Sequence, residues 1–399
     1  MKKTVFFVIS FEAYLDNKGN SRFIDIMNLL KNDYNCVLIS TDYSHILKKF
    51  RTIDRNTFED KNNIKLILLH ELGYNKNISI KRFISHFYFS RQLKKFLLTS
   101  NKPSKIYCSV PDFNVAKVCA DYCDKFNVEF ILDIQDIWPE AFKLVIDTPI
   151  INNTIYRIME KVANSVYKEA DKLIAVSDTY LERARRVNDT IYYLSAYLGT
   201  KYKEFKQIYD NASIIRPAGE FWVIYIGTLG RSYNIEMIIS AVAQLNREGK
   251  NIKFLCLGSG PKQNKLIEQA KNEECNAYFA GNVTYDVLIQ YLKSANVAMN
   301  ILFDNAAQSV TNKLGDYICA GLPIINTQKN KEVINLIENN KIGVNIDNDI
   351  SQIKNSINAY YNQYVLNKIK PHINESLIKE KFDRNINNKK IVNIIRKDI

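Results

Sequence analysis

The sequence predicts an α/β protein with two doubly wound domains and a C-terminal helix, and three observations predict this class. Short apolar runs alternate with longer amphipathic segments along most of the chain, which is typical of parallel sheets covered by helices on both faces. The alternation weakens between residues 195 and 219 and then begins again. The length of 399 residues suits two domains. We therefore expect a first domain at 1–205, a second at 215–375 and a helical tail at 376–399. One alternative for the tail is that it crosses back to the first domain.

In the first half, strands and helices are expected in turn. Apolar runs of four to six residues predict strands at 4–9, 36–40, 64–69, 106–110, 130–133 and 173–176. Apolar side chains at helical spacing predict helices at 23–30, 80–98, 114–126 and 154–170.

The second half repeats this order. Strands are expected at 222–226, 254–257, 278–280 and 297–302 and again from 324, and helices at 235–246, 263–272, 285–294, 313–320 and in the tail from 378. In doubly wound sheets, ligands bind beyond the carboxyl ends of the strands. Two such domains facing one another would form a cleft.

The composition limits the classes of protein. It is 46% hydrophobic and 24% charged, as in globular proteins. No apolar stretch reaches the roughly 18 residues that cross a bilayer, and the run after Lys3 is too short for a signal peptide, so we expect a cytoplasmic protein. Seven cysteines without a C-x-x-C pair and four scattered histidines predict reduced thiols and no metal site. The formal charge of +13 predicts an anionic partner: nucleic acid, an acidic membrane or a phosphorylated ligand.

The stretch from Asn300 to Thr327 organises the second half. It begins with the end of a buried strand, continues through a polar loop and then forms a helix that Gly321 and Pro323 end. The N-terminus of this helix has unpaired N–H groups and partial positive charge, which suits phosphate.

Lys313 and Asp316 are three residues apart and share a face of this helix. One hypothesis is that Lys313 binds a phosphate and Asp316 binds a pair of sugar hydroxyls. The other is that the two residues form a solvated ion pair that contributes little to stability. Gly315 lies between them, and glycine inside a helix costs roughly 1 kcal/mol against alanine. Its presence favours the first hypothesis, because it indicates that something approaches the helix closely.

Three glycine-containing loops follow strands of the second half, at 227–231, 258–261 and 281–283. Glycine lets a phosphate approach the backbone, and Arg231 offers a fork of donors. Each loop alone is ordinary turn chemistry. Together with the stretch above, they predict one pocket for a nucleoside diphosphate.

The second half resembles the donor domain of the retaining glycosyltransferases of family 4, which have the two-domain, Rossmann-like GT-B fold. The matching segments are YIGTLGR (225–231), LGSGP (257–261), FAGNV (279–283) and NKLGDYICAGLPII (312–325). In the first half, DIQDIWPE (133–140) and ADKLIAVS (170–177) match more loosely. The chain resembles in particular bacterial members that build capsules and O-antigens on lipid carriers.

The resemblance implies roles for named residues. The family has two glutamates with seven residues between them; Asp316 takes the position that binds the ribose and Gln308 the position that contacts the donor sugar. Arg231 and Lys313 correspond to the pair on the pyrophosphate, and Val283 lies where the base is held. The donor set implied in this way is Gly227, Thr228, Gly230, Arg231, Gly258, Gly260, Val283, Gln308, Ser309, Val310, Thr311, Lys313 and Asp316.

For catalysis, the resemblance implies Arg231 and Lys313 as stabilisers of the leaving group, without a metal. Asp136 is the candidate base of the first half; the alternative is that it caps a helix before Trp138. Asp133 and Glu140 are lesser candidates. The family's first glycine loop is replaced by KGNSR (18–22), from which we expect Gly19, Asn20 and Arg22 to contact the acceptor, with Glu12 nearby.

The segment from Ser79 to Lys105 combines basic and aromatic residues at helical spacing. Such a segment suits the surface of an anionic membrane; the alternative is an ordinary helix with a solvated basic face. No nucleic-acid-binding motif accompanies it, so we expect no nucleic-acid partner.

These patterns together predict a glycosyltransferase with retention, peripheral on the inner face of the cell membrane. Its donor would be a nucleotide-sugar, expected to be UDP-linked, its acceptor a lipid-linked glycan, and its product a surface polysaccharide. Two alternatives stay open: a nucleotide-sugar epimerase of the same fold, and a non-catalytic basic protein that binds membranes or nucleic acid.

Overall fold

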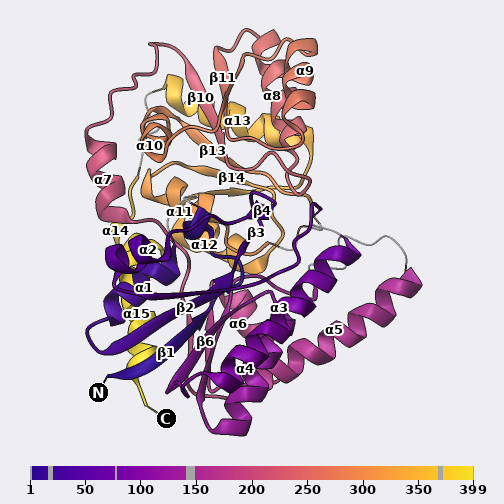
Figure 1. Ribbon diagram of the computed structural model, residues 1–399. Helices are drawn as coiled ribbons and strands as arrows, with labels where there is room; N and C mark the ends of the chain where they lie inside the picture. Colours follow the sequence, from indigo (N-terminus) through magenta and orange to yellow (C-terminus); the bar gives the residue numbers. More distant parts are fainter. Residues whose placement is uncertain are drawn as a thin grey trace. The chain divides into compact units, whose positions relative to one another are not determined.

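The computed structural model describes residues 2–16, 21–76, 79–140, 149–304, 306, 308–366 and 372–398, and in residues 149–155 it describes the backbone only. The chain divides into two compact α/β units (Figure 1). The first comprises Met1–Tyr197 with Ile386–Ile399, and the second comprises Leu198–Asn385.

The first unit is built on a parallel sheet of seven strands in the order β5-β2-β1-β6-β7-β8-β9. Its apolar runs form the strands because their side chains are buried on both faces. The strands are β1 (Lys3–Val8), β2 (Tyr34–Thr41), β5 (Lys65–Leu69), β6 (Lys105–Val110), β7 (Glu129–Ile134), β8 (Lys172–Ala175) and β9 (Tyr193–Ser195). A two-residue hairpin pair, β3 (Tyr43–Ser44) and β4 (Lys49–Phe50), follows β2.

Helices cover both faces of this sheet (Figure 1). One face packs on α1 (Arg22–Leu30), α2 (Arg55–Asn62) and the C-terminal α15 (Arg384–Arg396), whose apolar side chains share a core with Val5 and Phe7. The other face packs on α3 (Ile80–Thr99), α4 (Phe113–Phe126) and α5 (Pro149–Glu169). The short α6 (Asp178–Arg185) lies between β8 and β9.

Two buried lysines hold the end of α15 against the first sheet. Lys172 donates from Nζ to the carbonyl oxygen of Ile394 at 2.9 Å. Lys172 and Lys105 both donate to the carbonyl oxygen of Lys397. Glu129 pairs with both lysines at 2.6 Å. Because the last carbonyls of a helix carry partial negative charge, these ammonium groups stabilise its C-terminus. Residues 386–399 of the expected tail therefore belong to the first unit, whereas residues 376–385 belong to the second.

The second unit is built on a parallel sheet of six strands in the order β12-β11-β10-β13-β14-β15. The strands are β10 (Phe221–Ile226), β11 (Ile252–Leu257), β12 (Ala277–Gly281), β13 (Val297–Asn300), β14 (Ile324–Asn326) and β15 (Gly343–Asn345). The helices are α7 (Tyr202–Asp210), α8 (Ile235–Arg247), α9 (Gln263–Asn272), α10 (Tyr285–Ser294), α11 (Asn312–Cys319), α12 (Lys331–Asn340), α13 (Ile350–Val365) and α14 (Glu375–Leu377). A core of β10 and β11 side chains packs on α8, α9 and α13.

The first domain ends earlier than expected, at Tyr197 and not at residue 205. The reason is that residues 198–210 pack with the second unit. Thr200 exchanges backbone hydrogen bonds with Phe382 and Arg384 (2.8 and 3.0 Å). Tyr209 of α7 donates from its hydroxyl to the carbonyl oxygen of Ala320 at 3.1 Å.

Candidate functional site

The expected loops of the second unit meet at one edge of its sheet. The strand order reverses direction between β10 and β13. In doubly wound sheets, ligands bind at the carboxyl ends of the strands where this reversal occurs. The loop of residues 227–231 follows β10, and the segment of residues 301–311 leads from β13 to α11.

Two glycines of the second loop are required by packing within the protein. A Cβ at Gly258, where φ is +144°, would lie 1.9 Å from the carbonyl oxygen of Gly227. A Cβ at Gly260 would lie 2.6 Å from the carbonyl oxygen of Leu229. The N–H of Leu229 donates to the carbonyl oxygen of Ser259 at 2.9 Å. The close approach that glycine permits here is therefore that of the neighbouring loop.

Lys313 is buried, with 7% of its surface exposed, at the first turn of α11. Its Nζ lies 3.1 Å from the hydroxyl oxygen of Tyr225 and 3.7 Å from the ring centroid of Tyr233. Among the described residues, no carboxylate lies within ion-pair distance of it. Burial lowers the pKa of Lys313 well below its usual range, because the charged form loses its hydration. A Cβ at Gly227 would lie 3.7 Å from Nζ, so this glycine leaves the ammonium group open toward the loop.

The N-terminus of α11 adds donors next to Lys313. Thr311 is the N-cap, but its side chain accepts no capping hydrogen bond. Among the described residues, none accepts from the backbone N–H groups of Asn312 and Lys313. A buried cation and uncapped N–H groups on one turn are a site for an anion.

Asp316 lies one turn further along α11 and is held by two hydroxyl groups. Thr200 Oγ1 and Tyr285 Oη both donate to its Oδ1, at 2.7 and 2.6 Å. Within the described parts of the chain, no partner lies at hydrogen-bond distance from Oδ2. Burial raises the pKa of Asp316, and the two hydroxyl groups oppose this shift. One carboxylate oxygen thus orients the side chain, and the other is left to accept from a ligand.

Lys313 and Asp316 do not pair with each other, so the surface ion pair that the sequence left open is excluded. Gly315 does mark a close approach, but by the chain itself. A Cβ there would lie 3.2 Å from Thr200 Oγ1 and 3.4 Å from Phe382. The close approach expected at Gly315 is therefore made by Thr200 and Phe382, and this glycine by itself gives no support to a ligand.

Gln308 and Ser309 line the connection between β13 and α11. Gln308 donates from Nε2 to Ser232 Oγ at 3.2 Å, and its Oε1 is buried without a partner among the described residues. Ser309 Oγ donates to Glu332 at 3.2 Å. Gln328 donates to the backbone oxygens of both residues, at 2.5 and 2.9 Å. The orphaned Oε1 of Gln308 is an acceptor that a sugar hydroxyl would satisfy.

Arg231 is not brought to Lys313. Its side chain is exposed, and no contact joins it to the described residues of the site. Of the two residues expected to bind the pyrophosphate, Lys313 is therefore buried at the site in this structure and Arg231 is not. The remaining members of the predicted donor set are at least partly exposed on the loops around Lys313: Gly227, Thr228, Gly230, Val283, Val310 and Thr311.

In the first unit, Arg22 is not available to an acceptor. It is 5% exposed, and its Nη2 lies 3.3 Å from Oδ2 of Asp133. The Asp133 carboxylate also accepts from Tyr107 at Oδ2 and from Gln135 at Oδ1. Arg22 is buried because it neutralises a carboxylate in the core. Gly19 and Asn20 lie outside the described residues.

The other carboxylates of the first unit differ in environment. Glu12 is buried and accepts from Ser21 Oγ at 2.6 Å and Tyr14 N–H at 2.9 Å, and Glu140 pairs with Arg183. Asp136 is partly buried after β7 and accepts from the N–H of Ile137 at 2.8 Å. Burial raises its pKa. Its carboxylate also has Trp138 and Tyr180 as side-chain partners. Of these groups, Asp136 is the one that most closely follows the end of a strand, which is the position expected of a base.

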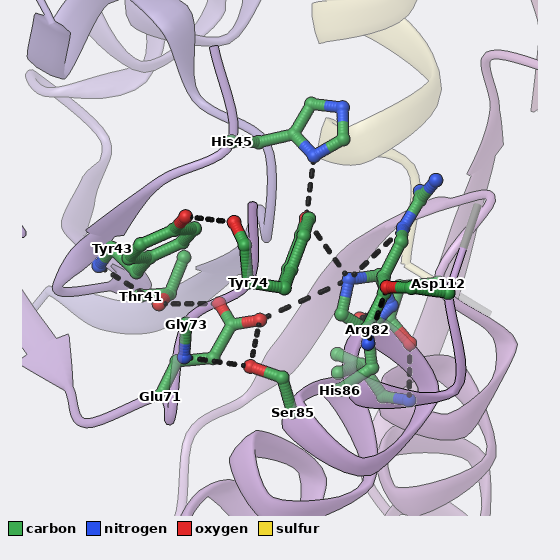
Figure 2. A network of polar contacts seen from close by, with 12 residues as sticks. Thr41, Tyr43, His45, Glu71, Gly73, Tyr74, Arg82, Ser85, His86 and Asp112 are labelled. Atoms are coloured by element: carbon green, nitrogen blue, oxygen red, sulfur yellow. Dashed lines mark hydrogen bonds and ion pairs between the residues drawn. The ribbon is translucent and has the colours of Figure 1, made fainter. Parts of the chain in front are cut away.

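Sequence analysis missed a polar network at the carboxyl ends of β2, β5 and β6, shown in Figure 2. At its centre is the Tyr74 hydroxyl group, 2.5 Å from Nδ1 of His45 and 3.3 Å from Nε2 of His86. His86 also faces Glu71 and Asp112, at 3.8 and 3.6 Å. The members come from four separate stretches between residues 41 and 112, so no local spacing reveals them.

No described group of three or more His, Cys, Asp or Glu side chains is arranged to hold a metal ion. None of the described helices combines the length and the apolar character that crossing a bilayer takes.

Residues 220–363 match the family model described as glycosyl transferases group 1. This segment contains Lys313 and Asp316, so the second unit carries a glycosyltransferase domain, as its motifs implied. Among curated proteins, none matches this sequence.

Several solved structures resemble the whole chain. HepE from Anabaena, in complex with UDP, has a TM-score of 0.68 and 13% identity over 98% of this chain and 99% of its own. WaaG, a glycosyltransferase involved in lipopolysaccharide biosynthesis, has a TM-score of 0.65 and 13% identity over 99% and 100%. Sucrose-phosphate synthase from Thermosynechococcus elongatus has a TM-score of 0.71 and 15% identity over 99% and 98%. These likenesses confirm the predicted two-domain GT-B fold.

Proposed function

We propose that this chain is a retaining glycosyltransferase that moves a sugar from UDP to a lipid-linked glycan, in the synthesis of a surface polysaccharide. The observation that carries the proposal is Lys313, a buried ammonium group with no carboxylate partner in the described part of the chain, at a helix N-terminus within a segment that matches glycosyltransferases. The structures of HepE with UDP and of a trehalose-6-phosphate protein from E. coli with UDP-2-fluoroglucose support UDP as the nucleotide.

The residues of the second unit fit the parts of such a donor. Lys313 and the N–H groups of α11 bind the pyrophosphate. Oδ2 of Asp316 accepts from the ribose hydroxyls, while Thr200 and Tyr285 fix Oδ1. Gln308 Oε1 accepts from a hydroxyl of the sugar. A carboxylate or amide acceptor facing hydroxyls, beside a cation facing phosphate, is complementary to a nucleotide-sugar.

The same groups act on the reaction. The bond between the anomeric carbon and the phosphate oxygen breaks, and negative charge grows on the departing diphosphate. Lys313 stabilises this charge from a site where few water molecules compete, so the interaction is stronger than in bulk solvent. The acceptor oxygen forms the new bond on the same face of the sugar and loses its proton. Asp136 is the first unit's candidate to receive it, and its raised pKa brings the group closer to working pH.

A thermal-shift series with UDP, GDP, dTDP and CMP, each with and without EDTA, tests the proposal. UDP at about 100 times its dissociation constant should stabilise the protein by roughly 2.7 kcal/mol. We expect EDTA to change nothing, because the proposal assigns no step to a metal. Stabilisation by none of the four would refute the donor site.

A second measurement separates a transferase from an epimerase and from a non-catalytic binder. UDP-sugars are incubated with a membrane extract that supplies lipid-linked glycans. A transferase releases UDP only when the extract is present, whereas an epimerase converts the donor without it. A protein that binds UDP and turns over no donor in either case contradicts the proposed activity.

A further inference from the structure

Apolar side chains are exposed on two neighbouring segments of the first unit, which we call the α3–hairpin surface. One segment is the β3–β4 hairpin and the other is the N-terminal half of α3. Exposure reaches 80% at Ile80 and 54% at Phe87, and 52% at Ile46. The members are Ile46, Leu47, Phe50, Leu72, Ile80, Phe83, Ile84 and Phe87.

On α3, the exposed apolar residues form a regular stripe. Residues 80, 83, 84 and 87 follow the spacing i, i+3, i+4, i+7, so they share one side of the helix. The opposite side is buried in the unit through Phe89, Leu93 and Leu97. The helix thus has one buried apolar side and one exposed apolar side.

The network in Figure 2 holds the hairpin and α3 together. Tyr74 contacts His45 of the hairpin and His86 of α3 through its hydroxyl group, at 2.5 and 3.3 Å. On the other side, the His70 ring stacks on Phe50 at 5.7 Å and meets the edge of Tyr88 of α3 at 5.9 Å. The surface is therefore one prearranged unit and not two independent loops.

The exposed charges on this surface are predominantly basic, and Asp42, which lies next to the hairpin, pairs with His70 at 2.8 Å. From Leu72 to Pro111 the sequence has eight lysines and arginines and no aspartate or glutamate. Six basic side chains on or next to the surface are exposed: Lys49, Lys76, Lys81, Arg91, Lys94 and Lys95. Near an anionic membrane, each basic residue contributes about 1 kcal/mol of attraction.

We propose that the α3–hairpin surface docks on an anionic lipid bilayer, with its apolar side chains among the acyl chains and its basic rim on the lipid phosphates. The inference rests on the proposed function, since a lipid-linked acceptor lies in a membrane. Five of the eight apolar members are Ile or Leu, whose side chains offer nothing to nucleic-acid bases, which stack on aromatic rings. Apolar residues inside a predominantly basic rim match instead the two layers of a bilayer interface.

Vesicle flotation tests the surface. The full chain is mixed with vesicles of phosphatidylcholine alone or with about 30% phosphatidylglycerol, whose charge supplies the attraction. We expect binding to the anionic vesicles only, and at least about tenfold weaker binding for Ile84→Ser/Phe87→Ser, which removes two inserting side chains. The matched control is Ile191→Ser/Ile215→Ser, because these residues are 79% and 85% exposed elsewhere in the chain. It should bind like the parent protein.

Three results would overturn the inference: no vesicle binding by the parent protein, equal binding by the Ile84→Ser/Phe87→Ser variant, or an equal loss in the control. The UDP thermal shift is measured on every variant, and its retention shows that the protein is folded. UDP binding without vesicle binding refutes the surface and leaves the proposed function intact. Vesicle binding without UDP binding refutes the donor site and leaves the surface intact.

Discussion

The Nζ of Lys313 lies 3.1 Å from the Tyr225 hydroxyl oxygen, and the rings of Tyr225 and Tyr233 both lie against the same ammonium group, at 4.2 and 3.7 Å to their centroids. These contacts stabilise a cation only in part. A buried charge without an opposite charge costs folding free energy, so its presence indicates a ligand that supplies the missing charge. The pyrophosphate of the proposed donor is such a ligand.

Lys313→Met should stabilise the free protein and abolish its response to UDP. Methionine keeps the length of the side chain and removes the desolvated charge, so the free energy of unfolding should rise by about 1–3 kcal/mol. The lost charge-assisted hydrogen bonds should weaken UDP binding by about 10- to 100-fold. Urea unfolding and calorimetric titration measure the two effects. A variant that is less stable, or that binds UDP normally, would show that Lys313 serves packing alone.

Asp316→Asn should weaken UDP binding more than it changes stability. The amide replaces one acceptor oxygen by a donor, so it cannot both accept from Thr200 and Tyr285 and accept from a ribose. We expect roughly tenfold weaker binding. Tyr285→Phe is the control: it removes one orienting hydrogen bond and leaves the carboxylate, so its effect should be smaller. Equal effects of the two changes would argue against direct contact between Asp316 and the ribose.

Gly260→Ala should destabilise the second unit, whereas Gly230→Ala should be tolerated. The new methyl group at position 260 would lie 2.6 Å from the backbone oxygen of Leu229, which cannot move without its loop. At position 230 the nearest atom, a methyl carbon of Thr228, is 3.6 Å away. We expect a loss of about 1–3 kcal/mol for the first change only. Similar melting temperatures for both variants would contradict the loop packing described above.

The fold was predictable because the local pattern of apolar and polar residues determines the alternation of buried strands and amphipathic helices. Most strands and helices lie within a few residues of their expected positions. The prediction named no helix at α2, α6, α7, α12 or α13. It also missed β9, β15 and the β3–β4 hairpin, whose strands have only two or three residues each. Periodicity cannot reveal elements of this length; long-range pairing forms them.

The candidate site was predictable where one segment carries it and not where distant segments meet. Lys313 and Asp316 follow from the helix that begins at Asn312. Arg22 was expected at an acceptor because it ends a polar loop, but Asp133, more than a hundred residues further along, draws it into the core. The partners of Gly315 and the members of the Tyr74 network are likewise set by tertiary packing.

Arg22→Met should reduce stability and leave UDP binding unchanged. It leaves the Asp133 carboxylate buried with Tyr107 and Gln135 as its hydrogen-bonding partners but without its cation. Removing one partner of a buried pair costs about 3–5 kcal/mol. Arg22→Met/Asp133→Leu, which removes both charges, should recover much of this loss. A single variant that is as stable as the parent protein but transfers no sugar would restore the acceptor role.

Asp112→Asn should change how stability depends on pH between about 4 and 6. Burial raises the pKa of Asp112 from 3.8 to about 6, so in this range the folded protein holds more protons than the unfolded chain, and this group makes the free energy of unfolding fall as pH rises. His86, which faces Asp112, Glu71, Arg82 and Lys48, has the opposite effect. Burial lowers its pKa from 6.5 to about 4, so the folded protein holds fewer protons and stability rises with pH. The two slopes, each at most about 1.4 kcal/mol per pH unit, offset one another in the parent protein.

In Asp112→Asn, the new amide keeps an acceptor for the Val115 N–H and removes the fall in stability with pH that Asp112 causes. Urea unfolding at successive pH values should therefore give a steeper rise for Asp112→Asn than for the parent protein, while Asp121→Asn, an exposed carboxylate of the same helix, follows the parent curve. Parallel curves for Asp112→Asn and the parent protein would show that the carboxylate and His86 do not titrate against one another.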